Sequence, residues 1–395
     1  MPQNVCSERE KKGRMANLEL LRCLAMMMVV IMHYLGKGNL LADLTEPQLT
    51  GTELAAWFLE CFCIVAVNIY MFISGFFLCT SSFKVSRLIQ LWLQVWVYSV
   101  GIGLLGALTG VMAGTDVDIH FMLTLLFPVS MGHYWFMTAY VFLYLLLPFV
   151  GTAVRRMDKR QLQAALALLL FAFCIIKSVL PVRFEMDGQG YDCLWYLCVF
   201  VTAAYVRRFG GGFLEKRRLG PVLYGGGCLL TFAVTLFLRR IYLRSGSLDT
   251  MLKFCMEYNH ILPFLAAIGL FSVFYGIKIH GKAAAFINRV APYTLGVYLL
   301  HENLGLRYTW PNWLGAGKVA EAMAEGSAGA FGLLLLWTAA AVIAVFVCGV
   351  LVDVLRKQAF GILHRGLMKV GIYRNLTGKI EKLDGIFKLE DGHVL

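Results

Sequence analysis

Two ionisable side chains interrupt the first long apolar segment of the sequence, Arg22 near its start and His33 near its end. At the centre of a bilayer each costs on the order of 3 kcal/mol or more, so such residues tend to face a cavity or a partner. Eleven residues of α-helix advance about 16 Å and return to nearly the same face. The spacing therefore predicts one helix face that carries a guanidinium and an imidazole at two depths.

These two residue types suit the transfer of a group from an anionic donor to an acceptor that arrives from the other side. Neutral imidazole accepts a proton near physiological pH, which makes His33 the candidate general base for a hydroxyl acceptor. A guanidinium recognises phosphate groups rigidly and bidentately, which assigns Arg22 to a phosphorylated donor. The alternative is that Arg22 extends to the headgroups and His33 marks the opposite interface. Spacing alone leaves both interpretations open.

Three further charged residues are candidates to complete this machinery. Glu60 lies in the second apolar segment at a depth that matches His33, and we expect it to orient the imidazole. Lys84 and Arg87 follow that segment on the cytoplasmic side and are expected to extend the donor site. The alternatives are an interfacial carboxylate and the ordinary positive charge of cytoplasmic loops.

Polar and aromatic residues at the external ends of later segments form the predicted acceptor site. A second catalytic histidine at His301 is one interpretation, and a histidine that caps a helix end is the other. Aromatic rings such as Trp135 stack on sugars, although tryptophan also belongs to interfacial belts. The predicted acceptor residues are His301, Glu302, Asn303, Arg307, His133, Trp135, Asn259 and His260.

The elements that position these residues are membrane helices. Of 395 residues, 59% are hydrophobic and 15% are charged, whereas soluble domains carry about 25% charged residues. Apolar runs of about 20 residues match the hydrocarbon thickness. We therefore expect an all-α, polytopic membrane bundle of about ten transmembrane helices. The predicted spans are 17–36, 54–80, 88–113, 134–153, 161–180, 191–206, 219–238, 258–277, 286–303 and 329–353.

Charge sets the expected orientation, because cytoplasmic loops retain lysine and arginine. With the N-terminus inside, 26 of the 36 basic residues fall on the cytoplasmic side and only eight fall outside. Both termini are therefore predicted to be cytoplasmic. The same distribution explains the net charge of +12 without nucleic acid as a partner. The main external cluster, Arg239, Arg240, Arg244 and Lys253, is expected to attract an acidic polysaccharide or a lipid-linked phosphate.

The eleven cysteines are scattered through the chain and form no CxxC pair. Zinc sites usually need ligands at close, paired spacing. We therefore expect buried apolar cysteines, with no metal and no disulfide framework.

Four segments together resemble a known family. They are Arg22 and His33 separated by ten residues, the aromatic-Ser-Gly stretch 68–77, the Tyr134-Trp135-Phe136 segment with Tyr140, Tyr144 and Pro148, and the Tyr-Leu-His helix end within 292–303. Their order and spacing resemble the acyltransferase-3 family, whose members are membrane proteins of about ten core helices. Many of them O-acetylate polysaccharides, lipopolysaccharide or related surface glycans.

The resemblance implies an O-acyltransferase with its membrane domain at residues 17–353, a cytoplasmic segment at 1–16 and a basic cytoplasmic tail at 354–395. It implies an acyl-CoA co-substrate, by default acetyl-CoA, no tightly bound cofactor, and a glycan or lipid-linked sugar acceptor. It also implies a multi-pass protein of a bacterial cell membrane. The alternative function is a secondary transporter that uses the same buried Arg22 and His33 as ligands or a proton relay. The lack of an apparent internal repeat disfavours it.

Overall fold

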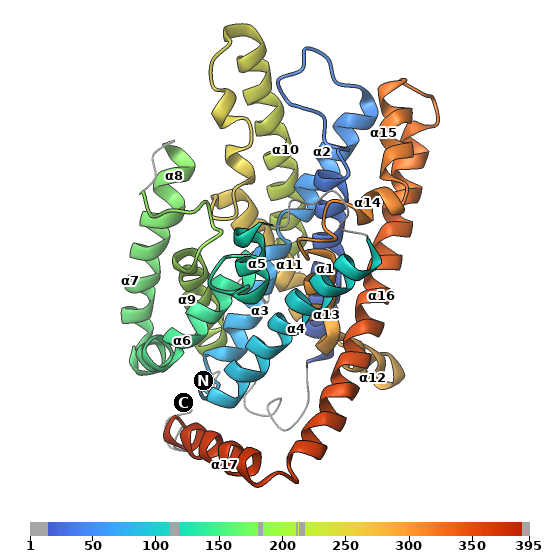
Figure 1. Cartoon of the computed structure of the whole chain (residues 1–395). Coiled ribbons are helices and arrows are strands. Elements are labelled where there is room, and N and C mark those ends of the chain that lie inside the picture. Colours follow the sequence, from blue (N-terminus) through green and yellow to red (C-terminus); the bar gives the residue numbers. More distant parts are fainter. Residues whose placement is uncertain (1–14, 111–117, 181–184, 211, 213–217, 389–395) are drawn as a thin grey trace.

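The computed structural model describes residues 15–110, 118–180, 185–210, 212 and 218–388, and these form helices, turns and loops with no strand (Figure 1). The predicted segment 1–16 lies outside the described residues except for Met15 and Ala16. The first half of the chain forms α1 (Ala16–Lys37), α2 (Gly51–Cys63), α3 (Ala66–Leu78), α4 (Val85–Thr109), α5 (Ile119–Leu126), α6 (Trp135–Arg156), α7 (Lys159–Leu170), a π-helical stretch (Phe171–Ile175), α8 (Ile176–Val179) and α9 (Cys193–Phe209).

The second half continues the bundle and ends in two helices that leave it. It forms α10 (Leu219–Ser245), 3-10 turns at Asp249–Met251 and Phe254–Met256, α11 (Ile261–Tyr275), α12 (Gly281–Val290), a 3-10 turn (Ala291–Tyr293), α13 (Thr294–His301), α14 (Trp310–Trp313), α15 (Ala316–Ala324), α16 (Ala330–Leu367) and α17 (Gly371–Ile386). Within the described residues, eight helical stretches are long and apolar enough to cross a membrane. This confirms the all-α polytopic bundle.

Two of the ten predicted spans are absent from those eight. Helix α9 has only 17 residues, and the ninth predicted span is not one helix. Pro292 lies in the 3-10 turn between α12 and α13, where its ring and missing N–H interrupt the helical hydrogen bonds. The short helix α13 therefore ends at His301, with eight residues. The helix that holds the last predicted span, α16, continues beyond it to Leu367.

Helix α1 is the centre of the bundle. It packs against α2, α3, α11, α12, α13 and α16, whereas α7, α8 and α10 lie further out (Figure 1). Loops that were predicted to share a side of the membrane also meet in space. On the predicted cytoplasmic side, Asp384 of α17 accepts hydrogen bonds from Ser86. On the predicted external side, Arg239 donates a hydrogen bond to the carbonyl of Glu46.

Close helix packing fixes α13, which carries part of the candidate site. A Cβ on Gly296 would lie 2.4 Å from the Cβ of Asp353 in α16, so only glycine fits there. Asp353 accepts hydrogen bonds from Gln94 and Tyr98 of α4 and from Arg356. Helices α4, α13 and α16 are thereby joined at one buried carboxylate.

Candidate active site

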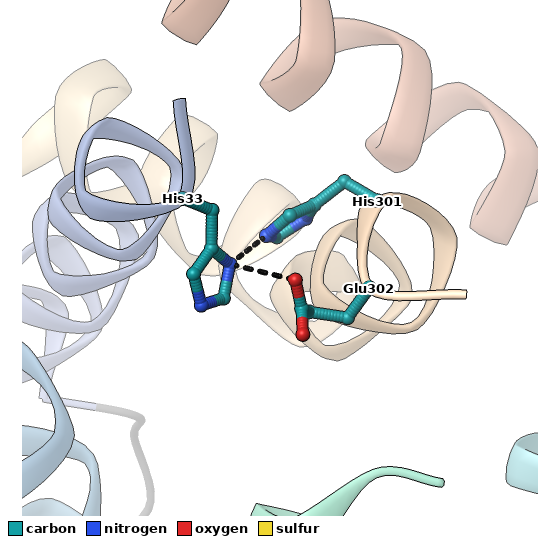
Figure 2. Close-up of side chains that lie close together, drawn as sticks. All are labelled: His33, His301 and Glu302. Carbon is teal, nitrogen blue, oxygen red and sulfur yellow. Dashed lines mark hydrogen bonds and ion pairs between the residues drawn. The ribbon is translucent and has the colours of Figure 1, made fainter. Parts of the chain in front are cut away.

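Three polar side chains from distant parts of the chain meet beside α1. His33 Nδ1 lies 2.9 Å from His301 Nε2 and 3.1 Å from Glu302 Oε1. Figure 2 shows both contacts at the same imidazole nitrogen. His301 and Glu302 are buried, while the side chain of His33 is 21% exposed. The predicted base and two predicted acceptor residues therefore form a single cluster.

The hydrogen bonds assign a tautomer to each imidazole. His301 Nδ1 lies 2.6 Å from the carbonyl oxygen of Val297, and a carbonyl can only accept, so this nitrogen carries the proton. His301 Nε2 is then an acceptor, and His33 Nδ1–H donates to it. This leaves His33 Nε2 with a free lone pair, the form that a general base requires.

A lysine and an arginine surround the cluster. Lys37 Nζ donates to Glu302 Oε1, the same oxygen that faces His33. The guanidinium of Arg307 lies within electrostatic reach of both His33 and Lys37. Glu302 thus neutralises one of two neighbouring cations and also faces the imidazole.

The same donor atoms are a candidate metal set, since one atom each from His33, His301 and Glu302 lie within 4.8 Å of one another. Two imidazoles and a carboxylate are ligands that zinc accepts. However, the Lys37 ammonium already binds the carboxylate oxygen, and a proton joins the two imidazoles. The arrangement suits proton transfer better than metal binding.

A narrow apolar cavity opens beside His33. It has a volume of about 40 Å³. Met26, Val29 and Met32 of α1 line one wall, and Met26 and Val29 lie one and two turns beyond Arg22 on the face that His33 shares. The rest of the lining is Val67, Tyr70, Trp135, Phe136, Tyr258, Leu295 and Tyr298. Trp135 thus lies at this cavity.

The predicted donor residues gather toward the N-terminal end of α1. Arg22 pairs with Glu19 at 2.8 Å, and Tyr70, which lines the cavity, donates to the carbonyl of Arg22. Arg22 and Arg87 both lie within electrostatic reach of Tyr140, so they approach one region. Lys84 begins α4 as its N-cap, where its backbone bonds the Tyr144 hydroxyl.

The structure places a different carboxylate beside His33 from the one expected, which was Glu60. Glu302 supplies the carboxylate that faces His33, and among the described residues no hydrogen bond or ion pair joins Glu60 to His33. Glu60 Oε2 is buried and has no hydrogen-bond partner in the part of the chain that the structure describes. The end of the broken ninth segment instead brings Glu302 to the imidazole.

Two predicted acceptor residues are fully used by the protein itself. The Ser99 hydroxyl donates to the carbonyl of Leu125, so it accepts from His133 Nδ1–H, and the Leu304 N–H donates to His133 Nε2. Burial, with a smaller effect of Arg307, lowers the pKa of His133 to about 3 and keeps it neutral. Asn303 is likewise buried, and its amide bonds backbone and Tyr134. Both residues shape the site.

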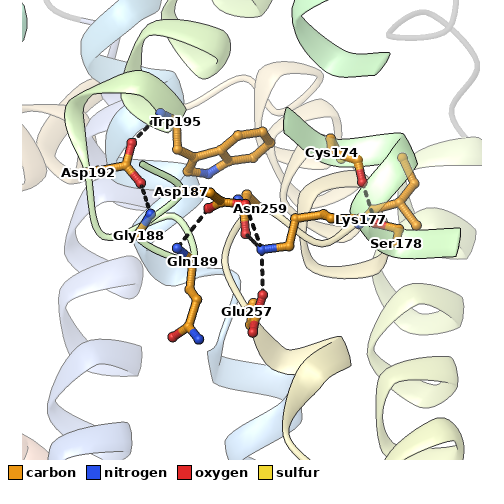
Figure 3. A network of polar contacts seen from close by, with 11 residues as sticks. Cys174, Lys177, Ser178, Asp187, Gly188, Gln189, Asp192, Trp195, Glu257 and Asn259 are labelled. Carbon is orange, nitrogen blue, oxygen red and sulfur yellow. Dashed lines mark hydrogen bonds and ion pairs between the residues drawn. The ribbon is translucent and has the colours of Figure 1, made fainter. Parts of the chain in front are cut away.

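Asn259 and His260 belong elsewhere. Figure 3 shows Asn259 within a network around Lys177, where it accepts from the ammonium at 2.8 Å and donates to Asp187 at 2.7 Å. His260 caps α11 by accepting from the Leu262 N–H. Neither side chain bonds to the His33 cluster.

Sequence reasoning missed Lys37, although a signal was present. Lys37 lies four residues after His33, on the same helix face, where i and i+4 side chains are neighbours. The cavity residue Tyr298 carried a similar signal, because it precedes His301 by three residues.

Comparison with known proteins identifies the family of the chain. A family model for an acyltransferase domain, acyltransferase 3, matches residues 15–353, which include α1, the cavity and the His33 cluster. No curated protein and no solved structure matches the chain. This protein therefore belongs to the acyltransferase-3 family and is a membrane acyltransferase.

Proposed function

We propose that this membrane acyltransferase transfers an acetyl group from cytoplasmic acetyl-CoA to a hydroxyl of a cell-surface glycan or its lipid-linked precursor. The observation that carries the proposal is the free lone pair on His33 Nε2, with Nδ1–H held by His301 and Glu302. We further propose that the protein acts in the cell membrane of a bacterium, where such glycans are assembled.

In this mechanism, His33 Nε2 removes the proton of the acceptor hydroxyl as its oxygen attacks the thioester carbonyl. The positive charge that develops on His33 lies 3.1 Å from the Glu302 carboxylate, which stabilises it. When the tetrahedral intermediate collapses, the carbon–sulfur bond breaks and the thiolate takes the proton from His33. The products are the ester and free CoA.

The size of the cavity supports a short acyl group. At about 40 Å³ the cavity is small, which favours a short acyl group such as acetyl over a long chain. Arg22, near the far end of the same α1 face, suits the phosphates of CoA. The donor thus approaches from the Arg22 end and presents its carbonyl to His33.

The test is CoA release by the purified protein in detergent, with labelled acetyl-CoA and a glycan acceptor. We expect acetyl ester on the glycan and equimolar free CoA. In detergent there is no second compartment, so a transporter would release no CoA. Labelled protein without labelled acceptor would indicate an acyl-enzyme and contradict direct transfer to the hydroxyl.

A further inference from the structure

Arg307 is a cation without a counter-ion beside the candidate active site. Among the residues that the structure describes, no carboxylate lies within ion-pair distance of its guanidinium, and its Nε is buried without a hydrogen-bond partner. Its nearest ring contact is Tyr308, whose centroid lies 5.1 Å from the guanidinium carbon. A partly buried guanidinium with unsatisfied donors is costly unless something else binds it.

A second cation shares this neighbourhood. Lys37 Nζ lies 5.9 Å from the centroid of the same Tyr308 ring, and Arg307 acts on Lys37 electrostatically. The nearby carboxylate, Glu302, is already bound to Lys37 and faces His33. Glu302 is therefore engaged by Lys37 and His33, and no ion pair joins it to Arg307 among the described residues.

Arg307 also lines a cleft that has room for such a ligand. The cleft has a volume of about 350 Å³, at the lower end of the range for small-molecule sites, which is about 300–1,000 Å³. Its lining residues are Asp118, His120, Phe121, Thr124, Met131, Gly132, His133, Leu304 and Arg307. Asp118 is engaged as the cap of α5, since it accepts from the Phe121 N–H at 2.7 Å. His133 has no free ring nitrogen, so Arg307 is the cation of this cleft with open donors.

We propose that the acceptor carries a negatively charged group, a carboxylate or a phosphate, and that Arg307 binds this group in the cleft. The proposal rests on the proposed acyl transfer to a glycan and narrows its acceptor to an anionic saccharide. A guanidinium matches the planar, two-oxygen geometry of a carboxylate or phosphate. Because Arg307 lines the cleft and acts electrostatically on His33, an anion bound there holds the attached sugar near the catalytic imidazole.

The external basic cluster is a weaker candidate for the same task. Arg239 donates to the Glu46 carbonyl, and Lys253 lies 5.2 Å from the centroid of Trp57. Arg239 and Lys253 each have one partner in the protein, although Arg239 Nε, like Arg307 Nε, has no hydrogen-bond partner among the described residues, and no member of the cluster lines the cleft. The unpaired cation beside the base is Arg307.

A binding experiment tests the proposal without relying on catalysis. Thermal unfolding of the purified protein is measured in the presence of glucose, glucuronate or glucose 1-phosphate. Glucuronate carries a carboxylate and glucose 1-phosphate a phosphate, so the two compounds show which anionic group binds. We expect at least one anionic sugar to raise Tm and glucose to leave it unchanged. Arg307→Gln should abolish the shift, Arg307→Lys should retain part of it, and Lys318→Gln, which changes an exposed lysine over Trp337, should leave it intact.

Acyl transfer supplies the second readout. With an anionic acceptor, we expect Arg307→Gln to raise the acceptor KM at least about 10-fold while kcat changes less than about 3-fold and the KM for acetyl-CoA stays constant. Equal Tm shifts with glucose and the anions, no shift with either anion, or an undiminished shift in Arg307→Gln would overturn the proposal. Those results leave CoA release by the wild-type protein untouched. Conversely, anion binding without CoA release would reject the acyl-transfer mechanism and retain the anion site.

Discussion

The His33 cluster and the network around Lys177 are both polar groups enclosed by apolar helices, but their hydrogen bonds end differently. Lys177 donates hydrogen bonds to Asp187 and Asn259 and forms an ion pair with Glu257, so its ammonium is enclosed by partners within the protein (Figure 3). In the His33 cluster, no described residue bonds His33 Nε2, since both contacts are at Nδ1 (Figure 2), and the imidazole lines a cavity. A closed network supports structure, whereas an open one can act on a substrate.

Their places in the bundle agree with this difference. Lys177 lies two residues after the π-helical stretch Phe171–Ile175, in the outer helix α8. Its side chain is 2% exposed and reaches across to the loop before α11. His33 lies on the central helix α1 and is joined to the end of α13. The outer network holds loops together, and the central cluster holds reactive atoms.

The largest effect is expected from His33→Ala. Removal of the base should lower kcat by about 10³-fold, with Tm and membrane abundance close to wild type. CoA release under saturating substrates measures it. His280→Ala, an exposed histidine before α12, is the matched control and should retain full activity. Full activity in His33→Ala would remove its assignment as base.

Lys177→Met should show the opposite pattern. The change leaves the Asp187 and Glu257 carboxylates close together and buried, and breaking a buried pair in this way costs about 3–5 kcal/mol. Thermal unfolding in detergent should report this loss, while kcat per folded molecule stays within about 2-fold. Lys159→Met, at the exposed start of α7, should change stability by less than about 0.5 kcal/mol. A normal Tm with lost activity would contradict the structural assignment of the network.

The variant Glu302→Gln tests whether Glu302 or Glu60 is the carboxylate that stabilises His33. The neutral amide cannot stabilise an imidazolium, so kcat should fall about 10²-fold with an unchanged KM for acetyl-CoA. Glu60→Gln is the matched comparison and should alter kcat by less than about 2-fold. A stronger effect from Glu60 than from Glu302 would restore the carboxylate expected from the sequence.

His133 is buried and both of its ring nitrogens are hydrogen-bonded. We therefore expect it to make the stability of the protein depend on pH. The pKa of folded His133 is about 3, against 6.5 for the free side chain, so below about pH 6.5 the unfolded chain binds a proton that the folded protein does not. Stability therefore falls as pH decreases, by about 2 kcal/mol from this group between pH 7 and pH 5. His133→Gln, which cannot be protonated, should lose correspondingly less stability over that range. Parallel Tm curves for both proteins would argue against a neutral His133.

The smallest expected effect is on acyl-group selectivity, and it tests whether the cavity beside His33 holds the acyl group. Val29→Ala enlarges the cavity by about two methyl groups, and we expect the ratio of propionyl to acetyl transfer to rise about 10-fold. Competition between the two CoA esters measures the ratio. The control is the same substitution at an exposed position of α16, Val347→Ala, which should leave the ratio unchanged.

The sequence was informative about functional residues that lie on the same helix. Arg22 and His33 could be predicted to share a face of α1 because helical periodicity is local, and the cavity lined by Met26 and Val29 lies along that face. The bundle itself followed from apolar segment length. The aromatic-Ser-Gly segment packs closely against α9, since a Cβ on Gly75 would lie 3.0 Å from the Cα of Phe200.

The sequence was uninformative where the site depends on which helices meet. Glu60 and Glu302 are both carboxylates at a suitable depth, and only the packing of α13 against α1 distinguishes them. The position of Glu302 in turn depends on the break at Pro292, which a hydropathy pattern reads as a continuous span. Asn259 and His133 appeared to be available ligands, because their partners Lys177, Ser99 and Leu304 lie far away in the sequence.

The shortness of α13 has a consequence for the membrane as an electrical insulator. Its eight residues rise about 12 Å, well below the roughly 30 Å hydrocarbon thickness, and non-helical backbone at that depth is tolerated only inside protein or beside water. Leu304 and Arg307, which follow α13, line the cleft. A water-filled cleft there shortens the apolar barrier at this point, and we expect the side chains of Met26, Val29 and Met32 to form the rest of the barrier against proton leakage.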